Sequence, residues 1–356
     1  MKTAVLSDGA ITVRDVPEPP LAPDHVMVRV RACGICGSDL RYMAGENPWA
    51  QHTLGVRKPN PPRMVPGHEV AGEIVAVGDP AMAHRIGERV VMMAFRGDDT
   101  CYYCRRGFHN LCENTSHLGH AAGWAELDLN PGGMAELCPI WAENAYTLPD
   151  SISFEDATLL DGAGVALHAV HVGGVQSGEP VAVTGCGSIG LLIVQVAKAL
   201  GAGPVVAIDV ADKPLALAGE LGADLVLNAR ESDVAAAVTR ATDGLGAATS
   251  FDTVGADATI AQSLCLLRRG GTAVMLAVEL RDAKLPMSCI AGERGLRVAA
   301  NFAYDEFPEV IEMMAAGQIR GGPMITHVFP LDETPRAFET ARAKAQSGAI
   351  KVVIQP

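Results

Sequence analysis

The chain has 356 residues, 49% of them hydrophobic, and a formal net charge of -13 at pH 7. This hydrophobic content excludes an intrinsically disordered protein, because disorder requires too little apolar surface to offset the entropy lost on folding. The acidic balance argues against nucleic acid as a partner, since phosphate backbones are held by clustered Lys and Arg, and no basic block occurs.

The first 149 residues consist of short apolar runs separated by Gly, Pro and Asp, a pattern typical of an irregular β domain. The predicted strands of this part are residues 26–30, 70–77, 89–94 and 134–139.

Two motifs in this part carry side chains that bind metals. They are CGICGSD at residues 33–39 and GHEVAGEIVAVG, which begins at Gly67. A thiolate, an imidazole and carboxylates from separate segments suit Zn²⁺, and three protein ligands leave the fourth position open for a substrate. The sequence therefore predicts an open zinc site.

From Ser153 onward, apolar strands and helices alternate. The predicted strands are residues 181–184, 205–208, 225–227, 249–254 and 272–277, and the first helices are residues 189–200 and 213–221. A helix at residues 307–316 and a strand at residues 351–354 follow. This alternation indicates an α/β domain with a doubly wound parallel sheet.

A glycine-rich turn follows the strand at residues 181–184. Gly185, Gly187 and Gly190 have the spacing GxGxxG, and Asp209 ends the next strand. Such a turn brings the backbone close to a pyrophosphate, the helix that follows stabilises its charge, and the acid accepts from ribose hydroxyls. The alternative to a dinucleotide-binding site is an ordinary Gly-rich turn, followed by an Asp that only ends a strand. The predicted dinucleotide site contains Gly185, Gly187, Ser188, Ile189, Gly190, Asp209 and Val254.

The residues after that strand favour NAD over NADP. Asp209 would repel a 2′-phosphate, and Val210 and Ala211 supply no Arg to hold one. Lys213 is near enough to Asp209 in the sequence that use of both NAD and NADP is left open.

Length and targeting signals set the remaining expectations. The length suggests about two domains. No run approaches the roughly 18 apolar residues of a membrane helix, and the first residues lack the apolar segment of a signal peptide. We therefore expect a cytoplasmic protein without a membrane partner. Nine cysteines in that reducing compartment are better explained by metal ligation and core packing than by disulfides.

In their order and spacing, these motifs resemble those of the zinc-containing medium-chain alcohol dehydrogenases over nearly the whole chain. The CGSD and LLDGAGVALHAV segments resemble the polyol, sorbitol and threonine dehydrogenase branch. The resemblance implies a mainly β, GroES-like catalytic domain at residues 1–155 and 300–356, and a Rossmann domain at residues 156–299. It also implies a homo-oligomer, either a dimer or a tetramer.

The resemblance further implies that Cys36 and His68 bind the catalytic zinc. Cys33 would then be a core residue, although a CxxC clamp is the rival interpretation. The third ligand position falls on Asp161, whose side chain is one methylene shorter than the more usual Glu, so Glu69 is the alternative ligand. Without ligation, Asp161 would cap a helix and Glu69 would be a buried acceptor. The resemblance places Asp39 behind the site, where it would accept the second imidazole N–H of His68.

A cysteine cluster resembles a second, structural zinc site. Relatives often carry four Cys there; in this chain the last three places hold Cys101, Cys104 and Cys112, and the first place holds Asp98. Three thiolates and one carboxylate still make a closed tetrahedral shell. The alternative is an empty lobe held by packing. His109 is a candidate substitute ligand or a solvated side chain.

The resemblance implies that zinc polarises the alcohol or carbonyl oxygen while hydride passes between a secondary alcohol and NAD. Ser38 matches the position whose hydroxyl moves the proton outward, although a Ser there could also be a turn residue. Arg41 occupies the place of a His in many relatives, and Arg cannot take up a proton. The proton would then leave through water, Asp39 or His52.

The substrate cleft is expected around Tyr42 and Trp49. His117, His120 and Trp124 would add polar and aromatic side chains near its mouth. This surface suits a small-molecule polyol, aminocyclitol or amino alcohol.

The sequence leaves three alternative functions. A primary alcohol or formaldehyde-type zinc dehydrogenase is the runner-up. A zinc-free quinone or enone reductase would lack the GHE motif and the cysteine cluster. A non-catalytic binding protein is disfavoured because Cys36, Ser38 and His68 occur together.

Overall fold

The computed structural model describes residues 1–123, 128–277 and 279–356 and divides the chain into two compact units. Unit 1 contains residues 1–161, 307–315 and 321–356, and unit 2 contains residues 162–306 and 316–320. The sequence placed the divisions after residues 155 and 299. In the structure the chain leaves unit 1 inside α4 (Leu160–Gly173) and re-enters it at α9 (Glu306–Ala315).

Unit 1 is built on a seven-stranded sheet. Its order is β16 (Ile325–Pro330), β17 (Lys351–Gln355), β3 (His25–Gly34), β4 (Glu69–Val77), β5 (Arg89–Met92) and β9 (Ala145–Thr147), and β8 (Leu137–Trp141) pairs with β3. Two smaller sheets are formed by β1 (Lys2–Ser7) with β2 (Ala10–Asp15) and by β6 (Phe95–Arg96) with β7 (Ser116–His117). The last strand, β17, lies beside β3, so segments far apart in the sequence share one sheet.

Strand β8 begins at Leu137, later than the predicted residue 134. The reason is that Met134 and Ala135 pair with the first strand instead: Ala4 N–H donates to the Met134 carbonyl at 2.8 Å, and Thr3 bridges Ala135. The apolar run is therefore shared between two partners, which its composition alone does not reveal.

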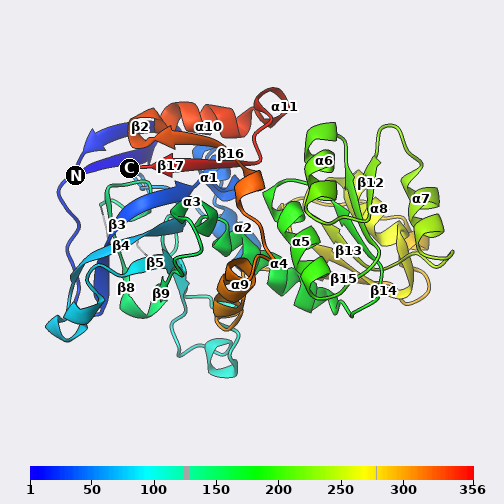
Figure 1. The fold of residues 1–356 in the computed structure, drawn as a ribbon, viewed down its shortest axis with the longest axis horizontal. Helices are drawn as coiled ribbons and strands as arrows, with labels where there is room; N and C mark the ends of the chain where they lie inside the picture. Colours follow the sequence, from blue (N-terminus) through cyan, green and yellow to red (C-terminus); the bar gives the residue numbers. More distant parts are fainter. Residues whose placement is uncertain (124–127, 278) are drawn as a thin grey trace. The chain divides into compact units, whose positions relative to one another are not determined.

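Unit 1 also contains short helices that are not among the predicted elements. They are α1 (Gly37–Met43), α2 (Pro48–Leu54), α3 (Phe154–Ala157), α10 (Thr334–Arg342) and α11 (Lys344–Ser347). Two of them, α3 and α10, pack on the seven-stranded sheet. In α2, Asn47 accepts from Ala50 N–H, Pro48 starts the helix, and Gly55 ends it with φ +66°. Helix α10 runs beside β16 and β17 (Figure 1).

Unit 2 is a doubly wound parallel sheet, as predicted. The strand order is β12 (Leu225–Asn228), β11 (Val205–Asp209), β10 (Val181–Thr184), β13 (Ala247–Asp252), β14 (Leu267–Met275) and β15 (Gly295–Val298). The order reverses between β10 and β13, which is where open α/β sheets bind ligands. Its helices are α5 (Ser188–Ala199), α6 (Asp212–Glu220), α7 (Val234–Ala241) and α8 (Asp257–Cys265).

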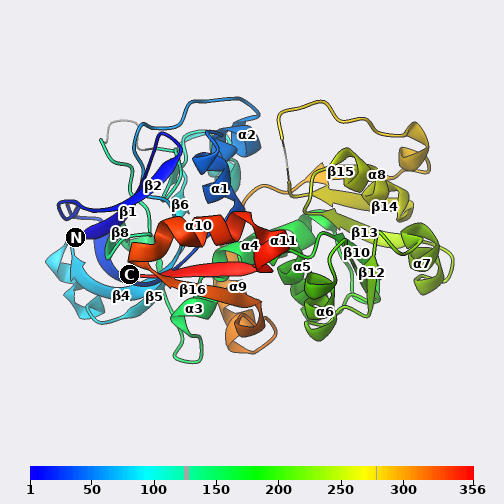
Figure 2. The same cartoon turned by 90° about the horizontal axis from the view of Figure 1, so that it is seen from above.

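The helices of unit 2 lie on both faces of the sheet. Helices α5 and α6 lie on one side and α8 on the other (Figure 2). All four residues of β10 are buried because both faces are covered, which explains the unbroken apolar run in its sequence.

The expectation that the cysteines do not form disulfides is wrong for one pair. Cys265 at the end of α8 is bonded to Cys289, with the two Cα atoms 4.7 Å apart. The two residues are 24 positions apart, and the packing of α8 against the turn at Met287–Ile290 brings them together. Cysteine spacing does not encode that contact.

No helix in the described ranges combines the length and apolarity needed to cross a membrane.

The glycines of the turn after β10 have different steric roles, which yields a prediction. A Cβ at Gly190 would lie 1.8 Å from the Gly185 carbonyl oxygen, whereas a Cβ at Gly187 would meet no atom within 4 Å. Gly190→Ala should therefore lower the free energy of unfolding by at least about 2 kcal/mol, because the helix must move away from the strand.

Gly187→Ala is the matched control and should stay within about 0.5 kcal/mol of the parent protein. Urea denaturation of both variants makes the measurement. Equal stability of the two variants would show that α5 does not pack on the turn as closely as described.

Candidate functional site

The Asp39 carboxylate joins two segments of unit 1 that carry candidate ligands. It is fully buried in α1, where Oδ2 accepts from Cys36 N–H at 2.8 Å and Oδ1 accepts from Gly67 N–H at 3.1 Å. The first bond is the capping interaction that starts α1. The second fixes the residue before His68, so one side chain holds both segments in place.

The predicted hydrogen bond from His68 to Asp39 is not formed. Both carboxylate oxygens are engaged by backbone N–H groups, and His68 Nδ1 has no hydrogen-bond partner among the described residues. Asp39 thus lies behind the site as expected, but it supports the backbone of the ligand segments rather than the imidazole.

Cys36, His68 and Glu69 come together as a candidate metal site. One ligand atom from each lies within 4.8 Å of the others. Cys36 comes from the loop after β3, and Glu69 begins β4, the neighbouring strand. His68 is buried immediately before β4. The antiparallel pairing of β3 with β4 therefore delivers the three side chains to one end of the sheet.

Lys351 enters this site from β17 and was missed in the sequence. Its Nζ pairs with Glu69 Oε2, and both side chains are only 3% exposed. Strand β3 separates β17 from β4, and a Cβ on Gly34 of that strand would lie 2.1 Å from Glu69 Oε2 and 3.0 Å from Lys351 Cε. The absent side chain of Gly34 makes room for the ion pair.

Negative charge is concentrated around His68. Burial opposes protonation of His68, but Cys36, Asp39 and Asp161 raise its pKa to about 10. Burial also disfavours the charge of Lys351, yet Glu69 and Cys36 raise its pKa overall. Because buried charges are stable only when paired, a divalent cation fits this set of sulfur, nitrogen and oxygen donors.

Asp161 stands next to the candidate ligands. Its Oδ2 is 3.9 Å from His68 Nε2, and burial raises its pKa to about 6. Two ligands each about 2 Å from zinc at a tetrahedral angle lie about 3.3 Å apart, so a small shift would admit Asp161 to the shell. Glu69 already has Lys351 as a partner, whereas Asp161, in the first turn of α4, has His68 as its one ion-pair partner among the described residues.

Ser38 and Arg41 lie on α1 in different situations. Ser38 Oγ is buried without a hydrogen-bond partner among the described residues. Arg41 is engaged, because its guanidinium contacts Glu46 at 2.8 Å and also bonds Gln51. Burial, and then the charge of Arg41, lower the pKa of the neighbouring His52 to about 4. Ser38 is therefore the side chain of α1 with an uncommitted hydroxyl.

His117 and His120 do not form an exposed mouth as expected; both are buried against His68. The ring centroids of His68 and His120 are 4.5 Å apart, and those of His117 and His120 are 4.0 Å apart. Tyr42, also buried, places its hydroxyl 3.2 Å from His120 Nδ1. Trp124, the third residue of that expectation, lies outside the described residues.

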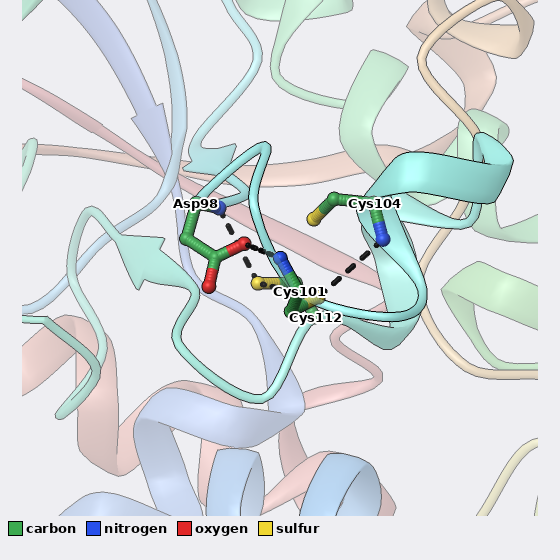
Figure 3. A group of neighbouring side chains, drawn as sticks. All are labelled: Asp98, Cys101, Cys104 and Cys112. Carbon is green, nitrogen blue, oxygen red and sulfur yellow. Dashed lines mark hydrogen bonds between the residues drawn. The ribbon is translucent and has the colours of Figure 1, made fainter.

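The second candidate metal site is the cysteine lobe shown in Figure 3. Ligand atoms of Asp98, Cys101, Cys104 and Cys112 all lie within 4.8 Å of one another. Backbone N–H groups support the sulfurs: Asp98 N–H donates to Cys112 Sγ at 3.3 Å, and Cys104 N–H donates to Cys101 Sγ at 3.4 Å. This last contact is the main cause that lowers the pKa of Cys101. The lobe is suited to a closed, structural zinc site.

Asp98 is oriented in this lobe by three donors. Asn114 Nδ2 donates to Oδ2 at 2.6 Å, and the N–H groups of Thr100 and Cys101 donate to Oδ1. These bonds, led by that of Asn114, lower the pKa of Asp98. His109 is not simply solvated, since its Nε2 lies 3.2 Å from Asp99 Oδ1, and the two form a second, overlapping candidate group with Cys104.

The glycine-rich turn of unit 2 is linked directly to Asp209. Cys186 N–H, inside the turn, donates to Asp209 Oδ2 at 2.7 Å, and the N–H groups of Val210 and Ala211 donate to Oδ1. Gly185 has φ +92°, and a Cβ there would meet Thr253 and Val254. Turn, acid and Val254 thus form one surface at the carboxyl ends of the strands, where a dinucleotide binds.

Two family models match the chain. The zinc-binding dehydrogenase model covers residues 188–316, and the alcohol dehydrogenase GroES-like domain model covers residues 22–150. Sorbitol dehydrogenase of Homo sapiens is 30% identical over 349 residues, which cover 96% of this chain and 92% of that protein.

Solved structures agree along the whole chain. An alcohol dehydrogenase from Escherichia coli CFT073 complexed with NADH has a TM-score of 0.88 at 26% identity. A zinc-binding dehydrogenase from Sinorhizobium meliloti 1021 bound to NADP has a TM-score of 0.87 at 28% identity. Each alignment covers 100% of this chain and 99% of the other.

The two metal sites predict the zinc content. Dialysed protein should contain two zinc ions per chain, and Cys36→Ser and Cys104→Ser should each lose one, because each removes a thiolate from a different shell. Asp161→Asn should lower occupancy of the Cys36 site at least about tenfold, since a neutral amide replaces the charged ligand. Elemental analysis by mass spectrometry measures this.

Glu69→Gln is the control for Asp161→Asn. Full zinc content in Asp161→Asn together with loss in Glu69→Gln would transfer the ligand role to Glu69. One zinc ion in the parent protein, removed by Cys36→Ser, would show that the cysteine lobe binds no metal.

Proposed function

This chain belongs to the zinc-binding medium-chain alcohol dehydrogenases, in the polyol branch, and we propose that it transfers hydride between a secondary alcohol and NAD. The observation that carries the proposal is the group formed by the half-buried Cys36 and the buried His68 and Glu69. We infer the substrate to be a polyol, aminocyclitol or amino alcohol.

Zinc fits the site of unit 1, and we assign Cys36, His68 and Asp161 as its ligands, with Glu69 able to exchange into the shell. When bound, zinc supplies Lewis acid chemistry that polarises the alcohol or carbonyl oxygen. Asp39 keeps the segments of Cys36 and His68 in register through its two backbone hydrogen bonds. The positive charge of Lys351 balances the negative charge of Glu69.

Ser38 is assigned the first proton transfer. Its buried hydroxyl lacks a protein partner among the described residues, so it is available to accept the substrate proton as it donates its own. Arg41 takes no part in the proton route because it stays charged and is held by Glu46. Water then links Ser38 to solvent.

NAD is assigned to the turn of unit 2. Gly187 leaves space over the start of α5, and the N-terminus of that helix favours the pyrophosphate. Asp209 accepts hydrogen bonds from the ribose hydroxyls, and its negative charge disfavours a 2′-phosphate. Use of NADP is the minor alternative.

We further propose that the protein works in the cytoplasm as a homo-oligomer, a dimer or a tetramer. Strand β15 supports self-association: it ends the six-stranded sheet, and Leu296 and Val298 are 44% and 51% exposed. An apolar edge strand of this kind favours pairing with another copy.

A substrate screen tests the proposed activity. With NAD and a panel of secondary alcohols, polyols, aminocyclitols and primary alcohols, kcat/KM should be highest for a secondary alcohol, read from the absorbance of the reduced cofactor. Chelation of zinc should abolish the activity and added Zn²⁺ should restore it, because the metal supplies the Lewis acid.

Cys36→Ser is the negative control for the screen. Faster oxidation of a primary alcohol or of formaldehyde in water would favour the runner-up function. Undiminished turnover after complete removal of zinc would overturn the zinc-dependent mechanism.

Cofactor preference depends on the charge of Asp209. Asp209→Asn keeps an oxygen that can accept from Val210 and Ala211 but removes the charge that repels a 2′-phosphate. We expect the preference for NADH over NADPH to narrow about tenfold, on the order of 1.4 kcal/mol. Fluorescence titration with both cofactors provides the measurement.

Gly187→Ala serves as the comparison. A methyl group there should weaken NADH and NADPH equally, because both share the pyrophosphate. An unchanged preference in Asp209→Asn would remove Asp209 from the ribose site.

A further inference from the structure

The cysteine lobe contains more metal-binding side chains than one zinc ion can use. One group, which fills a tetrahedral shell by itself, consists of Asp98, Cys101, Cys104 and Cys112. A second group consists of Asp99, Cys104 and His109, and its ligand atoms also lie within 4.8 Å of one another. The sulfur of Cys104 is common to both groups.

Asp99 and His109 are already spaced as two ligands of the same ion. His109 Nε2 lies 3.2 Å from Asp99 Oδ1, and two ligands each about 2 Å from zinc at a tetrahedral angle lie about 3.3 Å apart. The imidazole is also close to the shared sulfur, because a Cβ on Gly97 would lie 2.9 Å from Cys104 Sγ and 3.3 Å from His109 Cδ2. The sulfur and the imidazole therefore border the same space.

A single divalent ion would leave the lobe with excess negative charge. Sulfur ligands are deprotonated when they bind a metal, so the three thiolates and Asp98 carry four negative charges, and Asp99 adds a fifth. The Arg105 and Arg106 side chains each donate to a backbone carbonyl. His109 is the one ion-pair partner of Asp99 among the described residues. A second cation would offset much of this charge.

We propose that the lobe binds two divalent cations, Zn²⁺ or the softer Cd²⁺, with the Cys104 thiolate as a bridge between them. The first ion is bound by the four-residue group, and the second is bound by Asp99, His109 and the shared sulfur, with water as its fourth ligand. A thiolate keeps lone pairs after it binds one cation, so it can bind another. At about 2.3 Å from the sulfur, the two ions are at most about 4.6 Å apart.

The second ion has fewer protein ligands than the first and shares one of them. It should therefore bind more weakly, and dialysis against zinc-free buffer should remove it while the first ion stays in place. The inference does not depend on the proposed hydride transfer, because neither group contains a residue assigned to that reaction.

Equilibrium dialysis against low micromolar free Zn²⁺ tests the stoichiometry. The parent protein should bind three zinc ions per chain, one more than after dialysis against zinc-free buffer. His109→Ala should bind two, whereas Cys104→Ser should bind one, because loss of the shared sulfur removes both ions of the lobe. His84→Ala, which removes an exposed imidazole elsewhere, is the matched control and should bind three.

Three results of this dialysis would overturn the proposal. They are two ions in the parent protein, three ions in His109→Ala, and two ions in Cys104→Ser.

NMR of ¹¹³Cd tests the bridge in the parent protein, so it does not depend on how a variant folds. With Cd²⁺ in all sites, the two lobe resonances should split each other through the shared sulfur, and His109→Ala should show one lobe resonance without splitting. Two unsplit lobe resonances would refute the bridge. A single lobe resonance that shifts in His109→Ala would also refute it, and would show that the imidazole replaces Asp98 around one ion.

Discussion

The buried carboxylate of Asp39 is the contact on which the metal site depends. Cys36 and His68 are separated by more than thirty positions, and each lies in a loop whose backbone position must be fixed by other contacts. One side chain accepts from the backbone at Cys36 and at Gly67, and thereby holds both loops at the same end of the sheet. The shape of the site is therefore determined by backbone hydrogen bonds before any metal binds.

This arrangement gathers more negative charge than the protein alone can balance. Lys351 reaches in from β17 and pairs with Glu69, and Gly34 leaves the space that the pair fills. The remaining acidic groups raise the pKa of His68 strongly in the absence of metal. A site of this kind stabilises a bound cation. Without the cation, the repulsion between the buried negative charges opposes folding, and the rest of the protein must offset it.

Much of this could be predicted from the sequence, and the failures have physical reasons. The apolar strands of unit 2 and the turn at Gly185 are local patterns, so the sequence predicts them, and the predicted parallel sheet is confirmed. Lys351 could not be placed, since its partner Glu69 is 282 positions away and a lone Lys in an apolar strand indicates no particular partner. His120 was expected near the mouth of the cleft, but its burial against His68 depends on contacts that only the fold creates. Asp39 was located near the site, but its hydrogen bonds run to the backbone, which no motif specifies.

Because Lys351 lies in β17, its pairing with Glu69 also affects the order in which the two units can fold during synthesis. Residues 162–306, nearly all of unit 2, emerge from the ribosome before β17, and domains generally fold as units during synthesis. Unit 1 instead waits for a strand at residues 351–355 to complete its sheet. The nucleotide half can thus act as an early-folding core, whereas the nascent chain cannot acquire a charge-balanced metal centre until β17 has been synthesised.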